Sequence, residues 1–405
     1  MHGDVVSVGR QFERDHAPDA PGGTGDKANG TLAHAFYNRT MPSTQVISVS
    51  APLVRLIHEA IARQGGWLPF DRFMAMALYA HGLGYYASPG VKFGAMPGSG
   101  SDFVTAPELS PLFGKALAHQ VSQALTASEA NEVWEFGAGS GALAEQLMAA
   151  LGARVARYNI IDVSGALRER QRERLARYSA KVRWLDALPH LMAGVIIGNE
   201  VLDAMPVQLL HFDGSAWQER GVVSDRDGFA WADRATQLSA PFEHGLLPQT
   251  TTEIHPQAEA FIATLTERLQ RGAMFFIDYG FPQSEYYHAQ RDGGTLMCHR
   301  AHRSDADPLV DVGSKDITAH VNFSGIALAG QEHGLSVLGY TSQAHFLMNC
   351  GLLDLLESAT LAQRGNAQKL ITEHEMGELF KVIGFSKGCE FDAVGFARGD
   401  RTHTL

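Results

Sequence analysis

One short segment places an acidic residue, three glycines and the start of a helix next to one another. It reads Val133-Trp-Glu-Phe-Gly-Ala-Gly-Ser-Gly-Ala-Leu143, in which an apolar strand carrying Glu135 precedes Gly137, Gly139 and Gly141. Glycines let the backbone approach a ligand closely, and a helix N-terminus offers unpaired N–H groups. The segment therefore predicts a cofactor site. The alternative is a tight strand–helix connection whose glycines serve packing only.

The spacing of these glycines distinguishes between classes of cofactor. It follows GxGxG, whereas dinucleotide-binding turns follow GxGxxG, because a pyrophosphate needs the longer cradle. S-adenosylmethionine, whose product is S-adenosylhomocysteine, carries no phosphate, and its amino-acid tail fits the shorter turn. Glu135 would orient that tail directly or through water. The spacing favours this methyl donor and disfavours an NAD-dependent oxidoreductase.

Two more acidic residues follow the next strands. Asp162 ends the second strand, where a carboxylate can accept hydrogen bonds from both hydroxyls of a ribose. The alternative is a helix N-cap, since Ser164 and a helix follow. Asp186 follows the third strand, where an acceptor for the exocyclic amine of adenine is expected. For Asp186 a plain loop position is an equal alternative, and the neighbouring backbone could serve instead.

The elements that position these residues alternate along the chain. Short apolar strands are expected at 133–136, 158–162, 182–185, 195–198 and 273–278, and helices at 142–151, 166–180 and 257–269. This order predicts an α/β fold with a parallel sheet covered on both faces. Strands at 207–212, 216–223 and 228–232, separated by Asp-Gly turns, predict an antiparallel insertion. A last strand at 391–397, pairing with 336–340, is also expected.

The chain is expected to divide into four parts. Residues 1–45 are polar and rich in Gly, Asp, Pro and Thr, so they predict a disordered leader that cannot bury enough surface to fold. Residues 46–131 predict an N-terminal cap of helices and loops. Residues 132–203 and 254–397 form the Rossmann-like core, and 204–253 form the β insertion.

Composition narrows the class of protein. The chain has 405 residues and a formal net charge of −11, which disfavours a nucleic-acid partner on electrostatic grounds. Three cysteines without a CxxC pair are typical of a reducing compartment. No apolar run approaches the roughly 18 residues of a membrane span, and no signal pattern is present, so we expect a cytoplasmic protein.

Two local clusters have simpler interpretations than binding sites. The segment Cys298-His-Arg-Ala-His302 supplies one Cys and two His, which is no convincing four-ligand set, and no metal is expected. The basic residues of 168–181 are interleaved with Glu169 and Glu173. This pattern favours a solvated helix face over a nucleic-acid-binding patch.

Several motifs in a fixed order resemble those of a known family. They are Asp102-Phe-Val-Thr-Ala-Pro-Glu108, Glu135-Phe-Gly-Ala-Gly-Ser-Gly141, Gly198-Asn-Glu-Val-Leu-Asp-Ala-Met-Pro206, the segment 70–86 ending in Gly-Tyr-Tyr, Asp278-Tyr-Gly280 and Asp316-Ile-Thr-Ala-His-Val-Asn-Phe323. On these motifs, residues 53–397 resemble the MidA-like methyltransferases. The chain departs from the family pattern at Ala138, where proline is usual, and at Asp162, where glutamate is usual.

The resemblance carries expectations about fold, cofactor and partner. It implies a class I methyltransferase core and S-adenosylmethionine as the methyl donor. The family includes a mitochondrial assembly factor of respiratory complex I that methylates an arginine of a complex I subunit. A protein acceptor, with a complex I subunit as the candidate, is therefore implied.

A guanidinium acceptor suggests roles for the residues after the fourth strand. Asn199, Glu200 and Asp203 leave the carboxyl end of that strand, where α/β sites assemble, and carboxylates are natural partners for a guanidinium. We expect Glu200 to hold the acceptor, with Asp203 and Asn199 in support. A simple base is not expected, because guanidinium and carboxyl differ by roughly 8 pKa units, or about 11 kcal/mol. The alternative is a surface loop with a capping Asp203.

Two further motifs have a functional and a structural interpretation. Thr105, Pro107 and Glu108 precede a helix, and the resemblance implies that they close over the cofactor. The alternative is a capping segment only, because Thr with an acid three residues later is the capping-box pattern. Tyr279 either walls the acceptor pocket or packs in the core.

Two functions other than protein arginine methylation stay open. One is a non-catalytic assembly factor that uses bound cofactor structurally, against which Glu200 and Asp203 argue. The other is a methyltransferase that acts on a small molecule or RNA.

Overall fold

The computed structural model describes residues 50–88, 104–162, 164–226, 228–242, 249–300 and 303–405, all within the unit Ser48–Leu405. The predicted leader, 1–45, lies outside the described residues. So do residues 102 and 103 of the first family motif and residues 301 and 302 of the histidine-containing loop.

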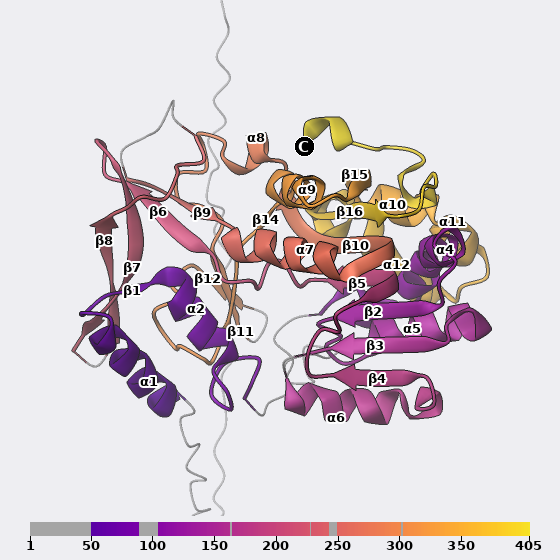
Figure 1. The fold of residues 1–405 in the computed structure, drawn as a ribbon, viewed down its shortest axis with the longest axis horizontal. Coiled ribbons are helices and arrows are strands. Elements are labelled where there is room, and N and C mark those ends of the chain that lie inside the picture. Colours follow the sequence, from indigo (N-terminus) through magenta and orange to yellow (C-terminus); the bar gives the residue numbers. More distant parts are fainter. Residues whose placement is uncertain (1–49, 89–103, 163, 227, 243–248, 301–302) are drawn as a thin grey trace, which may run out of the picture. The chain divides into compact units, whose positions relative to one another are not determined.

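A mixed sheet of eight strands forms the larger layer (Figure 1). Its strands are β2 (Glu132–Phe136), β3 (Arg157–Ile161), β4 (Val182–Leu185), β5 (Met192–Asn199), β10 (Leu269–Phe281), β14 (Val321–Asn322), β15 (Ser336–Ser342) and β16 (Phe380–Lys387). The order is β15-β16-β10-β5-β2-β3-β4, with β14 paired to β10. Neighbours from β10 to β4 are parallel, and β16 is antiparallel to both β10 and β15. The parallel strands therefore all end at one edge.

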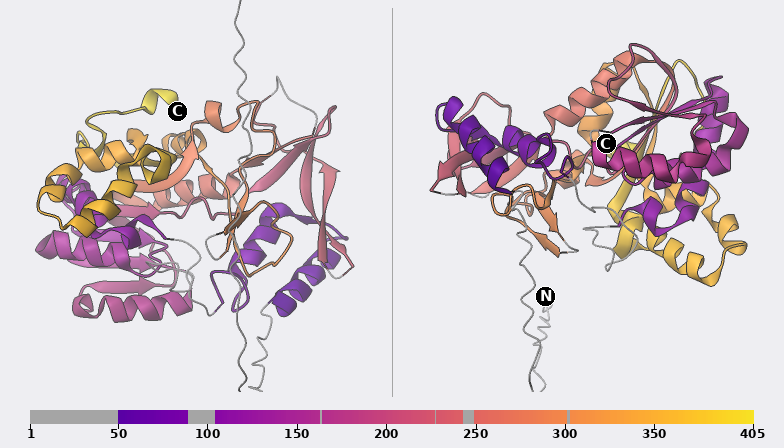
Figure 2. Two further views of the ribbon diagram at one scale, coloured as in Figure 1. Left: turned by 180° about the vertical axis from the view of Figure 1, so that it is seen from behind. Right: turned by 90° about the horizontal axis from the view of Figure 1, so that it is seen from below.

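Helices cover both faces of this sheet (Figure 2). Side chains alternate along a strand, so Phe275 of β10 packs into one apolar cluster and Phe276 into the other. The first cluster includes α4 (Pro111–Ala127), α5 (Ala142–Leu151), α10 (Gln343–Asn349), α11 (Leu352–Glu357) and α12 (Leu361–Ile371). The second includes α7 (Pro256–Arg268) and α9 (Phe323–Glu332). Helix α6 (Gly165–Arg174) follows β3, and α8 (Gln283–Tyr286) follows β10.

The prediction of a last strand at 391–397 is wrong. The strand that pairs with β15 is β16, and residues Val394–Phe396 form a 3-10 turn. The reason is steric: Gly339 and Gly384 are paired across β15 and β16, and the Phe396 ring lies against both. Phe396 thus covers the sheet face, and a side chain at either glycine would collide with it.

A second, antiparallel sheet joins the cap to the insertion. Its strands are β1 (Leu68–Pro69), β6 (Gln208–Phe212), β7 (Trp217–Asp225), β8 (Gly228–Ala235) and β9 (Thr250–Ile254). They run in the order β1-β7-β6-β9, with β8 along the other side of β7. Since β1 lies between α1 (Ser50–Arg63) and α2 (Phe70–Tyr79), the cap and the insertion share one sheet.

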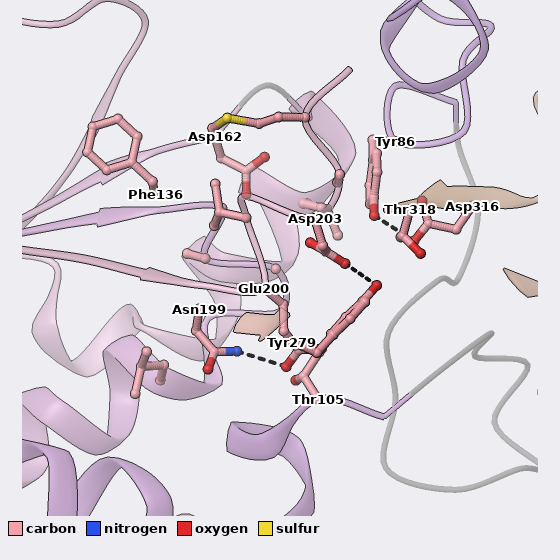
Figure 3. A pocket seen from close by; sticks show the side chains of 18 of the residues that line it. Tyr86, Thr105, Phe136, Asp162, Asn199, Glu200, Asp203, Tyr279, Asp316 and Thr318 are labelled. Carbon is pink, nitrogen blue, oxygen red and sulfur yellow. Dashed lines mark hydrogen bonds between the residues drawn. The ribbon is translucent and has the colours of Figure 1, made fainter. Parts of the chain in front are cut away.

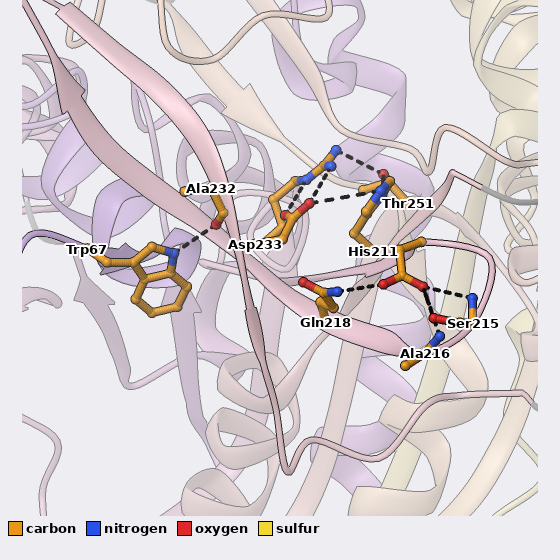
Figure 4. Close-up of polar contacts among 10 residues, drawn as sticks. Trp67, His211, Ser215, Ala216, Gln218, Ala232, Asp233 and Thr251 are labelled. Carbon is orange, nitrogen blue, oxygen red and sulfur yellow. Dashed lines mark hydrogen bonds and ion pairs between the residues drawn. The ribbon is translucent and has the colours of Figure 1, made fainter.

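Polar contacts tie this second sheet together (Figure 4). Trp67 donates its indole N–H to the Ala232 carbonyl at 2.7 Å. Arg220 of β7 makes two 2.9 Å hydrogen bonds to Asp233 of β8. Asp213 accepts from the backbone of the turn between β6 and β7, which is the Asp-Gly turn that the sequence predicts.

The cap has its own apolar cluster, and it draws on a distant segment. Leu53 and Phe73 pack there with Cys298 and Ile317. The latter two belong to a small sheet of β11 (Met297–Arg300), β12 (Arg303–Asp305) and β13 (Asp316–Thr318). Residues within the segment 254–397, assigned to the core by sequence, thus pack with the cap. None of the described helices is long and apolar enough to cross a membrane.

Candidate functional site

A cavity of about 920 Å³ opens at the carboxyl edge of the parallel strands. Residues at or just past the carboxyl ends of β2, β3, β5 and β10 line it, and so do residues of α2, β11 and β13. Its volume is within the range of roughly 300–1,000 Å³ that is usual for ligand sites.

The glycine turn forms one end of the cavity. Gly137, Gly139 and Gly141 have φ values of 61°, 53° and 83°, which favour glycine over residues with a Cβ. The turn is fixed by two hydrogen bonds, from Gly137 N–H to the Ile161 carbonyl at 3.0 Å and from Gly141 N–H to the Ala138 carbonyl at 2.7 Å. Gly137 and Gly139 line the cavity, whereas Gly141 is the N-cap of α5 and lies outside its lining.

Glu135 and Asp162 are buried beside this turn. Glu135 accepts from the Tyr158 hydroxyl at 2.7 Å, and burial raises its pKa to about 8. Asp162 accepts from Ser164 N–H at 2.9 Å and from the Gln171 amide at 2.8 Å. Burial raises the pKa of Asp162 as well, against these hydrogen bonds. The N-cap of α6 is Ser164, so Asp162 is not the cap residue of the alternative interpretation.

Asp186 does not reach the cavity. Its side chain is 89% exposed and paired with Arg168. Arg168 also donates to the carbonyls of Asp162 and Leu185, at 2.9 Å and 2.8 Å. These bonds hold the Arg168 side chain at the end of β4, where it pairs with Asp186. The geometry thus gives no support to the adenine contact expected for Asp186, which stays a prediction. Past β4 the cavity wall continues instead with the apolar side chain of Leu188.

The segment Thr105–Glu108 lies over the glycine turn. Glu108 accepts hydrogen bonds from Ser140 of that turn and from Arg174, whose Nη1 lies 2.7 Å from Glu108 Oε1. Burial raises the pKa of Glu108, but the hydrogen bonds from Arg174 and Ser140 outweigh burial and leave it lowered. Gln146 of α5 donates to the Pro107 carbonyl at 2.7 Å. These contacts fasten the segment to the turn.

The same segment also contacts the other end of the cavity. It forms the short helix α3 (Ala106–Leu109), whose first N–H, at Ala106, donates to the Glu200 carboxylate. Thr105 makes no side-chain capping bond, and the hydroxyl that caps α4 belongs to Ser110. The capping-box alternative is therefore wrong, and α3 connects the glycine turn with Glu200.

Asn199, Glu200 and Asp203 all line the cavity (Figure 3). The Asn199 amide donates to Glu200 Oε1 at 2.9 Å. Glu200 has a φ of 56°, in the left-handed region that non-glycine residues rarely adopt, and its N–H donates to the Ile277 carbonyl at 2.9 Å. Among the described residues, Asp203 Oδ1 and Asn199 Oδ1 are buried without a hydrogen-bond partner.

Asp278 holds the loop after β5 through hydrogen bonds to its backbone. Its Oδ2 accepts from the backbone N–H groups of Val201, Leu202 and Asp203, at 3.1, 2.9 and 3.3 Å. Asp278 is buried and lies on β10, the strand next to β5. It positions the carboxylates of the loop and does not line the cavity.

The carboxylates of this loop have perturbed acidity. Burial, and then the negative charge of Asp203, raise the pKa of Glu200 to about 8. Burial also raises the pKa of Asp203 to about 6, although the Tyr279 hydroxyl donates to it at 2.5 Å. Burial thus favours the neutral form of Glu200, whereas a cation beside it would favour the ionised form.

Tyrosines that the sequence motifs contain, but to which no role was assigned, form the opposite wall. Tyr79 and Tyr86 stack at 5.6 Å between ring centroids. Tyr86 donates to Asp316 at 2.7 Å, and Tyr79 donates to the Ala204 carbonyl at 2.8 Å. Asp316 is buried in the short strand β13. An acidic residue in a buried strand is the sequence signal that could have pointed to Asp316 as a site residue.

The described lining of the cavity is acidic. The described lining residues include six carboxylates and neither Lys nor Arg; the six are Glu108, Glu135, Asp162, Glu200, Asp203 and Asp316. Such a lining attracts a cation. Across the described part of the chain, no group of three or more His, Cys, Asp or Glu side chains is arranged to hold a metal ion.

Comparison with protein families decides the class of this site. Residues 114–341, more than half of the chain, match a family model described as "Putative S-adenosyl-L-methionine-dependent methyltransferase". The chain belongs to this methyltransferase family. The resemblance seen in the motifs is confirmed.

Solved structures and curated relatives agree with this assignment. A crystal structure of a protein from Burkholderia thailandensis bound to S-adenosyl-homocysteine is 49% identical to the methyltransferase, with a TM-score of 0.86, and the match covers 90% of this chain and 99% of that one. "Protein arginine methyltransferase NDUFAF7, mitochondrial" from Homo sapiens is 27% identical over 82% of each chain. Its homolog from Caenorhabditis elegans is 25% identical over 81% of this chain and 85% of that one.

Two predictions are thereby confirmed. The methyltransferase has a class I α/β core, and its cofactor is S-adenosylmethionine. The residues at the glycine turn fit such a ligand, since the turn presents backbone without Cβ atoms next to the buried carboxylates of Glu135 and Asp162.

Proposed function

We propose that this methyltransferase methylates an arginine side chain of a protein. The observation that carries the proposal is the acidic, tyrosine-lined part of the cavity around Glu200, Asp203 and Asp316. A guanidinium stays cationic at neutral pH and brings five N–H donors in a plane, which suits clustered carboxylates. The relatives named as protein arginine methyltransferases support the same acceptor.

In this proposal the cofactor occupies the half of the cavity next to β2 and β3. The glycine turn and Glu135 take the amino-acid tail, and Asp162 accepts from the ribose hydroxyls. Helix α3, with Thr105, Pro107 and Glu108, covers the cofactor. The apolar side chains of Leu167, Leu188 and Phe136 are the remaining surface for the adenine ring.

The bound cofactor supplies an electrophilic methyl group on a sulfonium sulfur. The protein must hold the acceptor nitrogen in line with that group and keep water away, which can be worth roughly 7–11 kcal/mol. Glu200 and Asp203 orient the guanidinium and balance its charge. When the new C–N bond forms, the S–C bond breaks with its electron pair on sulfur, and the nitrogen loses one proton. A carboxylate of this pair, with its raised pKa, is suited to receive that proton.

For the acceptor protein we propose a subunit of respiratory complex I. The support is the resemblance to the MidA-like family, together with 25–27% identity to the NDUFAF7 proteins. The cytoplasm is the compartment proposed for the reaction, on the sparse cysteines alone.

One labelling experiment tests the proposal. The purified protein is incubated with methyl-labelled S-adenosylmethionine and an extract of its host, and labelled species are identified by mass spectrometry. We expect methylarginine in a complex I subunit. Label on RNA, on lysine or on a small molecule would replace the acceptor, and complete absence of label with intact cofactor binding would favour a non-catalytic assembly factor.

A further inference from the structure

In the acceptor half of the cavity, two tyrosine hydroxyls already donate their protons to protein oxygens, so toward a ligand they can only accept a hydrogen bond. The Tyr86 hydroxyl donates its only proton to Asp316 Oδ2 at 2.7 Å. The Tyr79 hydroxyl donates to the Ala204 carbonyl at 2.8 Å. A phenol has one proton and can also accept, so each hydroxyl retains acceptor capacity for a ligand.

Two more oxygens, one of Asn199 and one of Asp203, can also accept a hydrogen bond from a ligand. The Asn199 amide nitrogen donates to Glu200, and a carboxylate only accepts, so the amide oxygen faces away from that bond. Asn199 Oδ1 and Asp203 Oδ1 have no hydrogen-bond partner among the described residues. Asp203 is 6% exposed, so its free oxygen is buried in a wall of the cavity. A buried acceptor without a hydrogen-bond partner destabilises the protein, and a ligand that donates to it would remove this cost.

We infer that Tyr86 is an acceptor-binding residue that selects a guanidinium, and that Asp316 is a positioning residue that keeps its hydroxyl turned as a hydrogen-bond acceptor. The inference rests on the proposed arginine acceptor and extends it to residues far from the glycine turn. Tyr86 belongs to the cap and Asp316 to β13, 230 positions apart in sequence, yet both line the cavity (Figure 3).

The geometry explains why such a wall would favour arginine over other side chains. Guanidinium offers five N–H donors and no acceptor, whereas the lysine ammonium offers three donors around a point. Citrulline has almost the shape of arginine, but an oxygen replaces one nitrogen and the charge is lost. Facing Tyr86 and Asp203, that oxygen would oppose another acceptor. Burial also raises the pKa of Tyr86 well above its ordinary value, so the hydroxyl keeps the proton that it donates to Asp316.

The experiment measures binding of three probes, Nα-acetyl-arginine amide and its lysine and citrulline counterparts, to the full chain saturated with S-adenosylhomocysteine. In the wild type we expect arginine to bind more tightly than lysine, and citrulline to bind least. Tyr86→Phe keeps the ring and should weaken arginine binding about tenfold, with the arginine-to-lysine ratio reduced and S-adenosylhomocysteine affinity within about twofold. Tyr287→Phe is the matched control, because it removes a hydroxyl bonded to the Glu253 carbonyl at 3.1 Å outside the cavity.

Asp316→Asn gives an independent readout. An asparagine amide can donate to Tyr86, which would turn the hydroxyl proton toward the ligand. We therefore expect citrulline to gain on arginine in Asp316→Asn, and we expect the double variant with Tyr86→Phe to show no further loss. A residue that only stabilised the fold would not change the ranking of the probes. Asp316→Asn also decides the matter if Tyr86→Phe does not fold.

The outcomes separate the two proposals. If the wild type prefers lysine or binds no arginine probe, the proposed function fails, and the role of Tyr86 fails with it. If the wild type prefers arginine, but folded Tyr86→Phe and Asp316→Asn leave every ratio unchanged, the inference about Tyr86 is wrong and the proposed function stands.

Discussion

The two halves of the cavity are built in different ways. The half proposed for the cofactor comes from consecutive strand–helix units, so Glu135, the glycine turn and Asp162 lie within about thirty residues of chain. The half proposed for the acceptor is assembled from α2, the loop after β5, β10 and β13, which the chain reaches at positions from Tyr79 to Thr318. A local motif reports on the first half, whereas only the tertiary structure defines the second. Variants should therefore separate cofactor binding from acceptor binding.

The largest effect is expected from Gly139→Val. Gly139 has a φ of 53° and lines the cavity, so a β-branched side chain would strain the backbone and fill space next to the ligand. We expect S-adenosylhomocysteine affinity to fall at least about 1,000-fold, which corresponds to roughly 4 kcal/mol. Titration calorimetry measures it. Retained affinity in a folded Gly139→Val protein would show that the cofactor does not lie on this turn.

A smaller loss, confined to the acceptor half, is expected from Glu200→Gln. The substitution keeps size and hydrogen-bonding capacity but removes the charge opposite a cationic acceptor. Methyl transfer should fall about 100-fold or more, because truncating a buried charged partner costs roughly 2–5 kcal/mol. S-adenosylhomocysteine affinity should stay within about twofold. Loss of both would move Glu200 to the cofactor half, and full activity would leave Asp203 as the residue that holds the acceptor.

The acidity of Glu200 predicts a pH dependence of about tenfold. Its pKa of about 8 means that it is mostly neutral at pH 7 and ionised at pH 9. Binding of Nα-acetyl-arginine amide should therefore be about tenfold weaker at pH 7 than at pH 9, since one pKa unit corresponds to a factor of ten. Calorimetry at pH 7 in two buffers of different ionisation enthalpy should detect proton release on binding.

Stability should change with pH in the opposite direction. The pKa of Glu200 in the folded state lies above its ordinary value of 4.5, so its contribution to stability is present at low pH and is lost as the pH rises through about 8. The melting temperature of Glu200→Gln should consequently fall less than that of the wild type between pH 6 and pH 9. Equal slopes would show that Glu200 titrates near its ordinary value.

The smallest effect is expected from Asp186→Asn. Asp186 is exposed and outside the cavity, and its ion pair with Arg168 is of the surface type, worth about 0–1 kcal/mol. Affinity for S-adenosylhomocysteine should change by less than about twofold. A tenfold loss by calorimetry would support the adenine contact that the sequence predicted for Asp186.

The sequence predicted the parallel core well because each strand and helix is set by local apolar periodicity. Strand β4 and helix α5 were predicted at their observed bounds, and Asp162 was placed beside the glycine turn. The strand predicted at 391–397 failed because Phe396 packs across two glycines of neighbouring strands, a contact between residues far apart in sequence. Tyr86 and Asp316 have no local pattern that joins them, so their pairing needed the fold.

The backbone of Glu200 has a consequence for how this family changes over time. A non-glycine residue in the left-handed region costs roughly 1–2 kcal/mol, and at this position the residue is also a carboxylate near another one. Glycine at position 200 would relieve both. Mutational drift alone would therefore tend to replace Glu200, and under the proposed acceptor role selection for methyl transfer would oppose that drift. Descendants that have kept the cofactor fold but abandoned methyl transfer should be recognisable by glycine at this position.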